Sequence, residues 1–172
     1  MTNNHSILTL QQLLNEFSKS YIIAEVELHN ILPYWVRQAN SVKLKNILLR
    51  YNDQIKKHVD MFEQYFEEDN ITYLSQSNRI MHALISTTDE MCTACGDSTT
   101  RDACLLSCIQ NINHYKIGSY GSAASFANSL GLSKTALLFH EFEINEKQID
   151  DRLSQLALNE ININAKRELI ED

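Results

Sequence analysis

Four ionisable side chains occupy or adjoin positions where the helical period of the sequence calls for apolar residues: Glu25, His58, Lys116 and Glu146. Groups at such depth must be paired, because an unpaired buried charge is costly. Carboxylates and imidazoles that point inward also build the di-iron and di-manganese centres of some helical bundles. The pattern therefore favours either a structural ion-pair network or a metal centre of the Fe or Mn type.

The ligand set of a complete di-metal centre is missing from this sequence. Such a centre uses about six protein ligands, including two Glu-x-x-His pairs. No Glu stands three residues before His58 or His114, and Lys116 would bring a positive charge beside the metal. We interpret Lys116 as taking the place of the cation between Glu25 and Glu146. The alternative is a single metal ion held by Glu25, His58 and Glu146.

All four cysteines lie in one short segment, "CTACGDSTTRDACLLSC", with the spacing C-x2-C-x8-C-x3-C: Cys92, Cys95, Cys104 and Cys108. The last two are one helical turn apart, and we expect the first two on the turn that leads into that helix. Three interpretations stay open: small buried packing residues, two disulfides, or one Zn²⁺ bound by four thiolates. The disulfides would run from turn to helix, as Cys92–Cys108 with Cys95–Cys104 or in the swapped pairing.

Apolar residues recur at steps of three and four in four separate stretches, which predicts four long amphipathic helices. The stretches run from Leu10 to Trp35, from Leu44 to Tyr65, from Leu105 to Leu130 and from Phe139 to Leu156. Glu25 stands beside the first apolar stripe, whereas His58, Lys116 and Glu146 stand on theirs. Pro33 should bend the last turns of the first helix or end it early.

The connections between the predicted helices differ in length, and this difference defines a topology. Short links join the first helix to the second and the third to the fourth, so each pair forms an antiparallel hairpin. The segment 68–98 between the second and third helices is far longer than a usual link, and it should contain a short helix near 74–90. We therefore predict an all-α fold, a ferritin-like antiparallel four-helix bundle with a long crossover between helices 2 and 3.

Length, charge and composition exclude several classes of protein. The 172 residues suit a single ferritin-like domain, 1–172, with a core over about 7–160 and a polar C-terminal tail that should fray. The formal net charge of −7 and the lack of a basic cluster argue against a nucleic-acid partner. No apolar run is long enough to cross a bilayer and the first residues lack a signal-peptide pattern, so we expect a cytoplasmic protein without membrane contact.

Three stretches resemble one known family. "YIIAEVELHNILP" resembles the first-helix pattern Y-x-AE-x-Q-x-x-x-x-LP of the YciE/YciF-type ferritin-like proteins, which are bacterial and associated with stress responses. "RDACLLSCIQNINHYKIGSYGS" and "EKQIDDRLSQLA" resemble the third and fourth helices of the same family, and the similarity covers about residues 7–157. It implies a ferritin-like bundle, often dimeric, with a carboxylate-rich centre capable of binding iron-type metals. By position, Glu25, Glu146 and Asp150 match acids of the family.

The departures from the family pattern fall on two of its acids and on its second-helix motif. Where the family has VEHYE, both glutamate positions are changed, to Asn113 and Lys116. The second-helix pattern H-x-x-x-T-x-x-Q becomes Tyr51, Ile55 and His58. The resemblance therefore implies a member whose di-metal centre is degenerate, with Lys116 replacing a carboxylate ligand.

Three functions from different classes are consistent with these residues. The first is a non-catalytic structural or interaction protein, stress-associated and homodimeric, whose protein partner the sequence does not name. The second is a metal-binding oxidoreductase or iron-handling protein that uses Fe or Mn at Glu25, His58 and Glu146. The third is a thiol-redox or Zn-stabilised module built on the four cysteines.

Overall fold

The computed structural model describes residues 6–73 and 77–166, and within these ranges the chain is helical and contains no strand. Five long helices follow one another: α1 (Leu10–Gln38), α2 (Val42–Glu68), α3 (Arg79–Ala94), α4 (Ser98–Ser129) and α5 (Ser133–Leu156). A π-helical turn (Ala157–Ile161) and the short helix α6 (Asn162–Ala165) extend α5.

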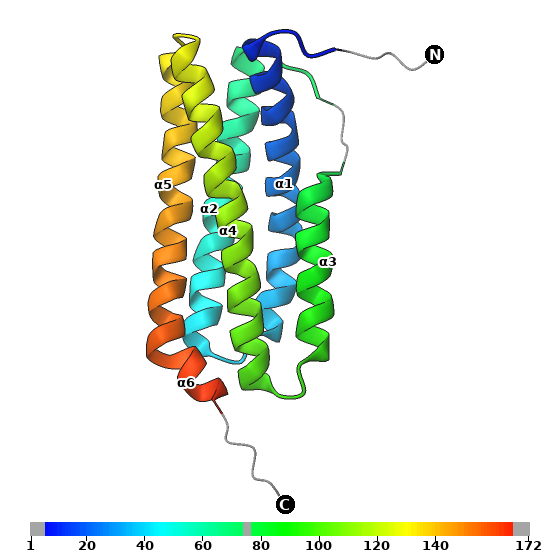
Figure 1. Cartoon of the computed structure of the whole chain (residues 1–172), viewed down its shortest axis with the longest axis vertical. Coiled ribbons are helices and arrows are strands. Elements are labelled where there is room, and N and C mark those ends of the chain that lie inside the picture. The colour runs from blue at the N-terminus through cyan, green and yellow to red at the C-terminus, as the bar shows by residue number, and fades with distance from the viewer. Residues whose placement is uncertain (1–5, 74–76, 167–172) are drawn as a thin grey trace, which may run out of the picture.

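Helices α1, α2, α4 and α5 form an antiparallel bundle, and α3 lies outside it along α1 and α4 (Figure 1). Each bundle helix packs on two others, since α1 and α5 both contact α2 and α4. Between α2 and α4 the chain runs back along the bundle through α3 (Figure 1). This architecture confirms the predicted all-α bundle with a long crossover between the second and third bundle helices.

The crossover helix starts and ends about four or five residues later than we predicted, at Arg79 and Ala94. It has 16 residues and begins after the N-cap Asn78, whose side-chain oxygen accepts a hydrogen bond of 2.8 Å from the backbone N–H of Met81. The amide nitrogen of Asn78 donates to the backbone oxygen of Ser20 at 2.9 Å, which ties the start of α3 to α1. Residues 74–76, where the predicted start fell, lie outside the described residues.

Pro33 lies inside α1, and the helix continues to Gln38, so the expectation of an early end is wrong. Proline removes one helical hydrogen bond, but the side chains on either side of it still pack into the core. Leu32 and Trp35 are both buried, and the Trp35 indole N–H donates to Asp89 on α3 at 2.7 Å. Tertiary packing therefore holds the last turn of α1.

The C-terminal tail is ordered further than its polar composition suggested. Residues 157–165 are helical, and Ile161 is buried in the same apolar cluster as Leu153. The expected fraying does not begin within this stretch, and residues 167–172 lie outside the described part of the chain.

The bundle interior consists of two apolar clusters with a polar layer between them. One cluster lies around the α1–α2 turn and contains Trp35, Leu48, Ile109 and Leu153. The other lies toward the α4–α5 turn and contains Phe62, Tyr120, Phe139 and Phe142. The residues between them along each helix are the buried polar ones: Glu25, His58, Asn113, Lys116 and Glu146. The fold therefore brings the ionisable residues of all four bundle helices to one level.

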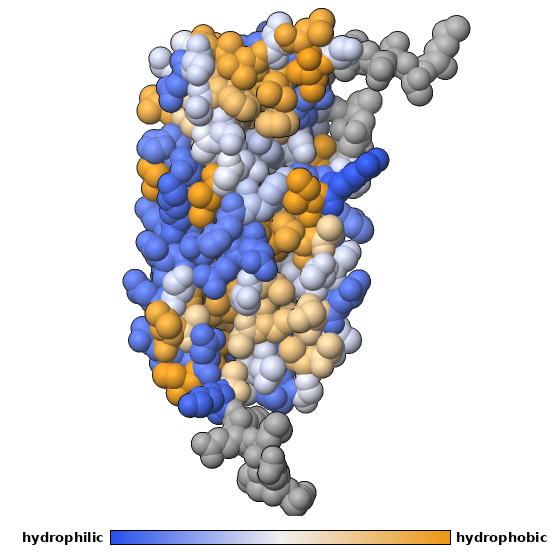
Figure 2. All heavy atoms as spheres, in the orientation of Figure 1, coloured by the Kyte–Doolittle hydropathy of each residue, from blue (hydrophilic) through white to orange (hydrophobic). Residues whose placement is uncertain are grey.

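Figure 2 shows hydrophilic and hydrophobic residues in separate patches on the face in view. Hydrophilic residues gather over the middle of α4 and α5, and hydrophobic residues gather near the end where α4 turns into α5. Among the described helices, none has the length and apolar character that a membrane span requires.

Candidate functional site

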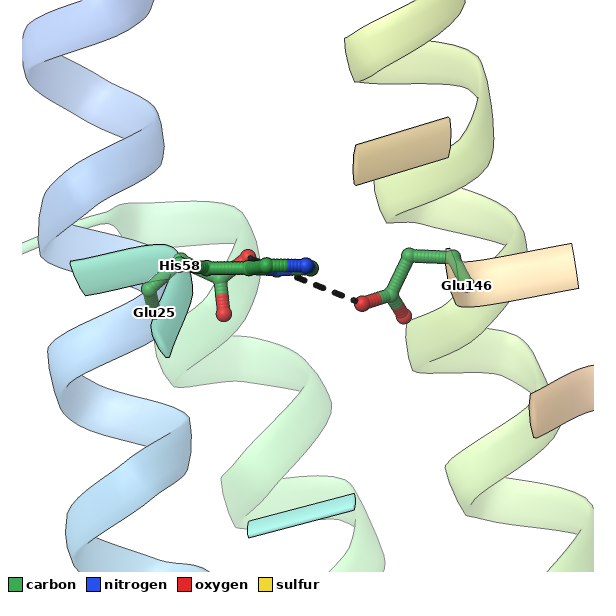
Figure 3. Close-up of side chains that lie close together, drawn as sticks. All are labelled: Glu25, His58 and Glu146. Atoms are coloured by element: carbon green, nitrogen blue, oxygen red, sulfur yellow. Dashed lines mark hydrogen bonds and ion pairs between the residues drawn. The ribbon is translucent and has the colours of Figure 1, made fainter. Parts of the chain in front are cut away.

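The polar layer receives residues from each of the four bundle helices. Glu25 comes from α1, His58 from α2, Lys116 from α4 and Glu146 from α5, and none of their side chains is more than 2% exposed. Figure 3 shows Glu25, His58 and Glu146 pointing toward one another across the bundle interior. The structure therefore brings together the residues that the sequence singled out in the bundle centre. We had expected Glu25 beside the buried stripe of α1. In the structure it lies fully in the interior.

Lys116 is the hub of this layer. Its ammonium nitrogen lies 2.7 Å from Oε1 of Glu146, 3.0 Å from Oε2 of Glu25 and 3.2 Å from the hydroxyl of Tyr51. An ammonium group has three N–H donors and no acceptor, so these three contacts use its full capacity. The ammonium is thus a satisfied buried cation between two carboxylates.

Two polar side chains complete the surroundings of Glu146. Tyr51 donates its hydroxyl to Oε2 of Glu146 at 2.6 Å, and Asn113 donates its amide to the same oxygen at 2.7 Å. The Asn113 amide also lies 3.1 Å from the Tyr51 hydroxyl. Both residues stand where the family pattern has other side chains, and here they supply donors to a carboxylate. Sequence reasoning did not assign them this role, although Asn113 lies one turn before Lys116 on the same helix face.

The other carboxylate, Glu25, is held by a histidine and a tyrosine. Tyr120 donates its hydroxyl to Oε1 of Glu25, and His58 Nδ1 lies 3.4 Å from the same oxygen. On its other side, Nε2 of His58 lies 3.2 Å from the amide nitrogen of Asn145, which can only donate. His58 thus bridges Glu25 of α1 and Asn145 of α5 through its two ring nitrogens.

The two carboxylates outnumber the Lys116 ammonium by one charge. The hydroxyl and amide donors of Tyr51, Asn113 and Tyr120 all point at carboxylate oxygens, and they stabilise this excess negative charge. Buried carboxylates such as these need a partner for each charged oxygen, since a buried unpaired charge is strongly destabilising. The geometry meets this requirement.

The electrostatics of the layer favour the charged forms of its acid and its base. Burial by itself would raise the pKa of Glu25, but the Lys116 ammonium and the His58 hydrogen bond outweigh it, and the pKa lies below its usual range. Burial would likewise lower the pKa of Lys116, but Glu146 and Glu25 raise it above the ordinary lysine value. Burial and the same two carboxylates raise the pKa of Tyr51 well above normal. Tyr51 therefore remains a neutral donor.

The donor set does not fit a dinuclear metal centre. Among the described residues, one group of acidic, histidine or cysteine side chains can converge on a metal ion: Glu25, His58 and Glu146, with ligand atoms within 4.8 Å of one another. Both carboxylates already bind the Lys116 ammonium, which occupies the space where a cation would lie. Within the layer, the Asn113 amide oxygen is the one buried side-chain acceptor that lacks a partner, and a single amide oxygen cannot replace the missing ligands.

Asp150, the third acid that the family resemblance assigned, does not reach this centre. Its carboxylate lies partly exposed on the flank of α5, 3.1 Å from His114 and 3.0 Å from the amide of Gln110. Asp150 lies one helical turn beyond Glu146 on α5, and its carboxylate oxygens bond Gln110 and His114 of α4 at that level. It belongs to a polar contact between α4 and α5.

The cysteines are separated into one close pair and two others. We expected Cys92 and Cys95 on the turn that leads into the next helix. In the structure Cys92 lies in the last turn of α3 and Cys95 is its C-cap residue. The Sγ atoms of Cys92 and Cys104 are 3.9 Å apart, all four thiols are free, and each is half-buried. Burial raises the pKa of Cys92 to about 11 and raises that of Cys104 further. The Cys92–Cys104 contact matches one of the two disulfides of the swapped pairing, and both the disulfides and the zinc site stay predictions.

Comparisons with known proteins agree with this architecture. The sequence matches a family described as Domain of unknown function (DUF892) over residues 9–166. Protein YciF of Escherichia coli (strain K12) is 30% identical over 144 residues, which cover 83% of this chain and 87% of that protein.

Two solved structures share the fold. The crystal structure of the E. coli stress protein YciF has a TM-score of 0.86 and 28% identity, and the match covers 93% of this chain and 100% of that one. YcfI, described as a putative structural protein from Rhodopseudomonas palustris, has a TM-score of 0.84 and 23% identity, with 88% and 96% of the two chains covered. The chain therefore belongs to the DUF892 family and is of the YciE/YciF type.

Proposed function

We propose that this protein is a non-catalytic, stress-associated ferritin-like bundle with a structural or interaction role, whose degenerate di-metal centre is closed by Lys116. In this proposal the ammonium does the electrostatic work of a metal ion, because it neutralises inward carboxylates from α1 and α5. The bundle then needs no metal to hold its four helices together.

One observation carries the proposal: Lys116 donates to Glu25, Glu146 and Tyr51 at 3.0, 2.7 and 3.2 Å, in a site that is 2% exposed. A cation so placed repels a second cation at a few ångströms. It also engages oxygens of both carboxylates, which are the ligands that iron and manganese would need. The descriptions of the two relatives, as a stress protein and as a putative structural protein, support the same class of role.

Metal binding by the purified full-length protein tests the proposal. The protein is incubated anaerobically with Fe²⁺ or Mn²⁺, passed through a desalting column and analysed by mass spectrometry for metal per chain. We expect well under one equivalent of either metal. A content of roughly two Fe or Mn per chain would overturn the proposal in favour of an iron-handling protein or a di-metal oxidoreductase.

A mononuclear site is the second candidate, and one observation favours it. The ligand atoms of Glu25, His58 and Glu146 lie within 4.8 Å of one another, as a bound ion would require. If the wild type binds about one equivalent of Mn²⁺ and His58→Ala abolishes this binding, the mononuclear site replaces the first proposal. One equivalent of Zn²⁺ that depends on the cysteines would instead support the Zn-stabilised module.

A homodimer and a cytoplasmic location, which we expected from the sequence, remain predictions. Light scattering coupled to size exclusion at several protein concentrations measures the first directly. A mass near one chain, 19.8 kDa, at all concentrations would contradict the dimer.

A further inference from the structure

Two of the four cysteines contact each other across the junction between the crossover and the bundle. Cys92 lies in the last turn of α3 and Cys104 in the second turn of α4, and their Sγ atoms are 3.9 Å apart. The other two thiols have different surroundings. Cys95 donates to the backbone oxygen of Met91 at 3.3 Å, and Cys108 borders a separate groove beside Thr87 and Thr88 of α3.

We propose that Cys92 and Cys104 are a thiol-modification site, which a low-molecular-weight disulfide converts into a reversible α3–α4 disulfide. The present separation exceeds a bonded S–S length of about 2.05 Å, so closure requires rotation of the side chains. The two residues lie on adjacent helices that already pack against each other, so the fold itself holds the thiols near one another.

The exchange proceeds in two balanced steps. The Cys92 thiolate attacks one sulfur of the small disulfide, which forms a mixed disulfide and expels one small thiolate, and this thiolate takes up the proton that Cys92 lost. The Cys104 thiolate then attacks the Cys92 sulfur, forms the protein disulfide and expels the second small thiolate, which is protonated in turn. Two protein thiols are oxidised, and one small disulfide is reduced to two small thiols.

Access to the pair favours Cys92 as the first nucleophile. Cys92 borders a cavity of about 240 Å³ between α1, α3 and α4, whose lining also includes Trp35, Asp89 and Arg101. The guanidinium of Arg101 provides a positive charge there for an anionic disulfide such as that of glutathione. The charged and ionisable groups around Cys92 are Tyr34, Asp89, Arg101 and the three other thiols.

The raised thiol pKa makes the exchange slow at neutral pH. Burial holds the pKa of Cys92 at about 11, so only a small fraction of the thiol is ionised at pH 7, and the thiolate is the reacting species. The pair is therefore suited to long exposure to an oxidising thiol pool and not to rapid turnover. Once formed, the disulfide fixes the end of the crossover helix to the bundle.

The test treats the full-length protein with oxidised glutathione at pH 8 and maps the product by non-reducing peptide mass spectrometry. We expect loss of two of the four thiols and one Cys92–Cys104 disulfide. The matched control Cys95→Ser/Cys108→Ser keeps the pair and should form the same disulfide. Cys92→Ser and Cys104→Ser should not form it, and Cys104→Ser should stop at the mixed glutathione disulfide on Cys92.

Thermal denaturation gives a second readout that does not depend on mapping. The disulfide closes a short loop in the unfolded chain, so the oxidised wild type should melt roughly 6 °C higher than the reduced form. Dithiothreitol should reverse this shift, and Cys104→Ser should not show it. Four unreacted thiols after prolonged exposure, or a disulfide that joins Cys95 or Cys108 instead, would overturn the proposal.

Discussion

The ammonium nitrogen of Lys116 on α4 lies 2.7 Å from Oε1 of Glu146 on α5, in the interior of the bundle. Thirty residues separate the two in sequence. The same ammonium contacts Glu25 on α1, so one side chain links three helices. A change at this position therefore alters the pairing of two buried carboxylates at once.

Lys116→Met should destabilise the fold by about 3–5 kcal/mol, because it leaves the buried carboxylates of Glu25 and Glu146 without their cation. Urea denaturation followed by circular dichroism measures the change in unfolding free energy. Lys134→Met is the matched control, since Lys134 pairs with Glu68 at the surface, where its side chain is 81% exposed, and should change stability little.

A compensating variant separates loss of pairing from loss of packing. Lys116→Met combined with Glu25→Gln and Glu146→Gln removes both negative charges and should recover part of the lost stability. If Lys116→Met were as stable as the wild type, or if the triple variant were less stable than the single one, the pairing explanation would be wrong.

Returning acids to the family positions should restore metal binding. Asn113→Glu/Lys116→Glu removes the competing ammonium and adds two carboxylates beside Glu25, His58 and Glu146. We expect about one equivalent of Mn²⁺ or Fe²⁺ per chain and not two, because Tyr51 still stands where the family has a histidine ligand. Isothermal titration with Mn²⁺ measures the stoichiometry, and Lys134→Glu controls for added surface charge. Unchanged binding in the double variant would contradict the degenerate-centre interpretation.

Stability should fall at both ends of the pH scale. The folded pKa of Glu25 is lowered, so its contribution is present above the unfolded value of about 4.3 and is lost as the pH falls through the folded pKa. The folded pKa of Lys116 is raised, so its contribution is present below the unfolded value of about 10.4 and is lost as the pH rises through the folded pKa. Between these limits the contribution of the layer should be constant.

Chemical denaturation at a series of pH values checks this profile. Glu25→Gln cannot titrate, so its stability should decline less steeply between pH 5 and pH 3, by up to about 1.4 kcal/mol per pH unit relative to the wild type. The decline above pH 10 should persist in this variant, because Lys116 still pairs with Glu146. An identical acid slope in both proteins would show that Glu25 is not among the groups that titrate on unfolding.

Asp102 should be a major anchor of the turn between α1 and α2. It lies on α4, is 2% exposed, and accepts hydrogen bonds of 2.7 Å from the backbone N–H groups of both Asn40 and Ser41. Asp102→Ala removes two charge-assisted hydrogen bonds and should cost roughly 3 kcal/mol of stability. Ser107→Ala, on the exposed face of the same helix, is the control. A cost equal to that of the control would contradict the anchoring role.

Most of the fold followed from the sequence, because helical periodicity is a local property. The stripe from Leu44 to Tyr65 and that from Phe139 to Leu156 are buried as predicted, and the length of the segment between α2 and α4 correctly indicated the crossover. The errors fell where tertiary contacts override local preference. α1 continues past Pro33 because Trp35 is buried beyond it, and the tail stays helical because Ile161 reaches the core.

The candidate site was also predicted in part from the sequence and decided in part by the tertiary structure. Residue types and spacing identified Glu25, His58, Lys116 and Glu146, because a charge on an apolar stripe needs a partner whatever the partner is. The sequence also placed Lys116 between Glu25 and Glu146, and the structure has both contacts. Only the packing of four helices at one level decided that Tyr51, Asn113 and Tyr120 supply the remaining donors. For the cysteines, the spacing predicted that they meet near the crossover. The packing of α3 on α4 then decided that Cys92 and Cys104 are the pair in contact. Hydrogen bonds and thiol contacts depend on distances of a few ångströms between separate helices, and a one-dimensional pattern does not fix such distances.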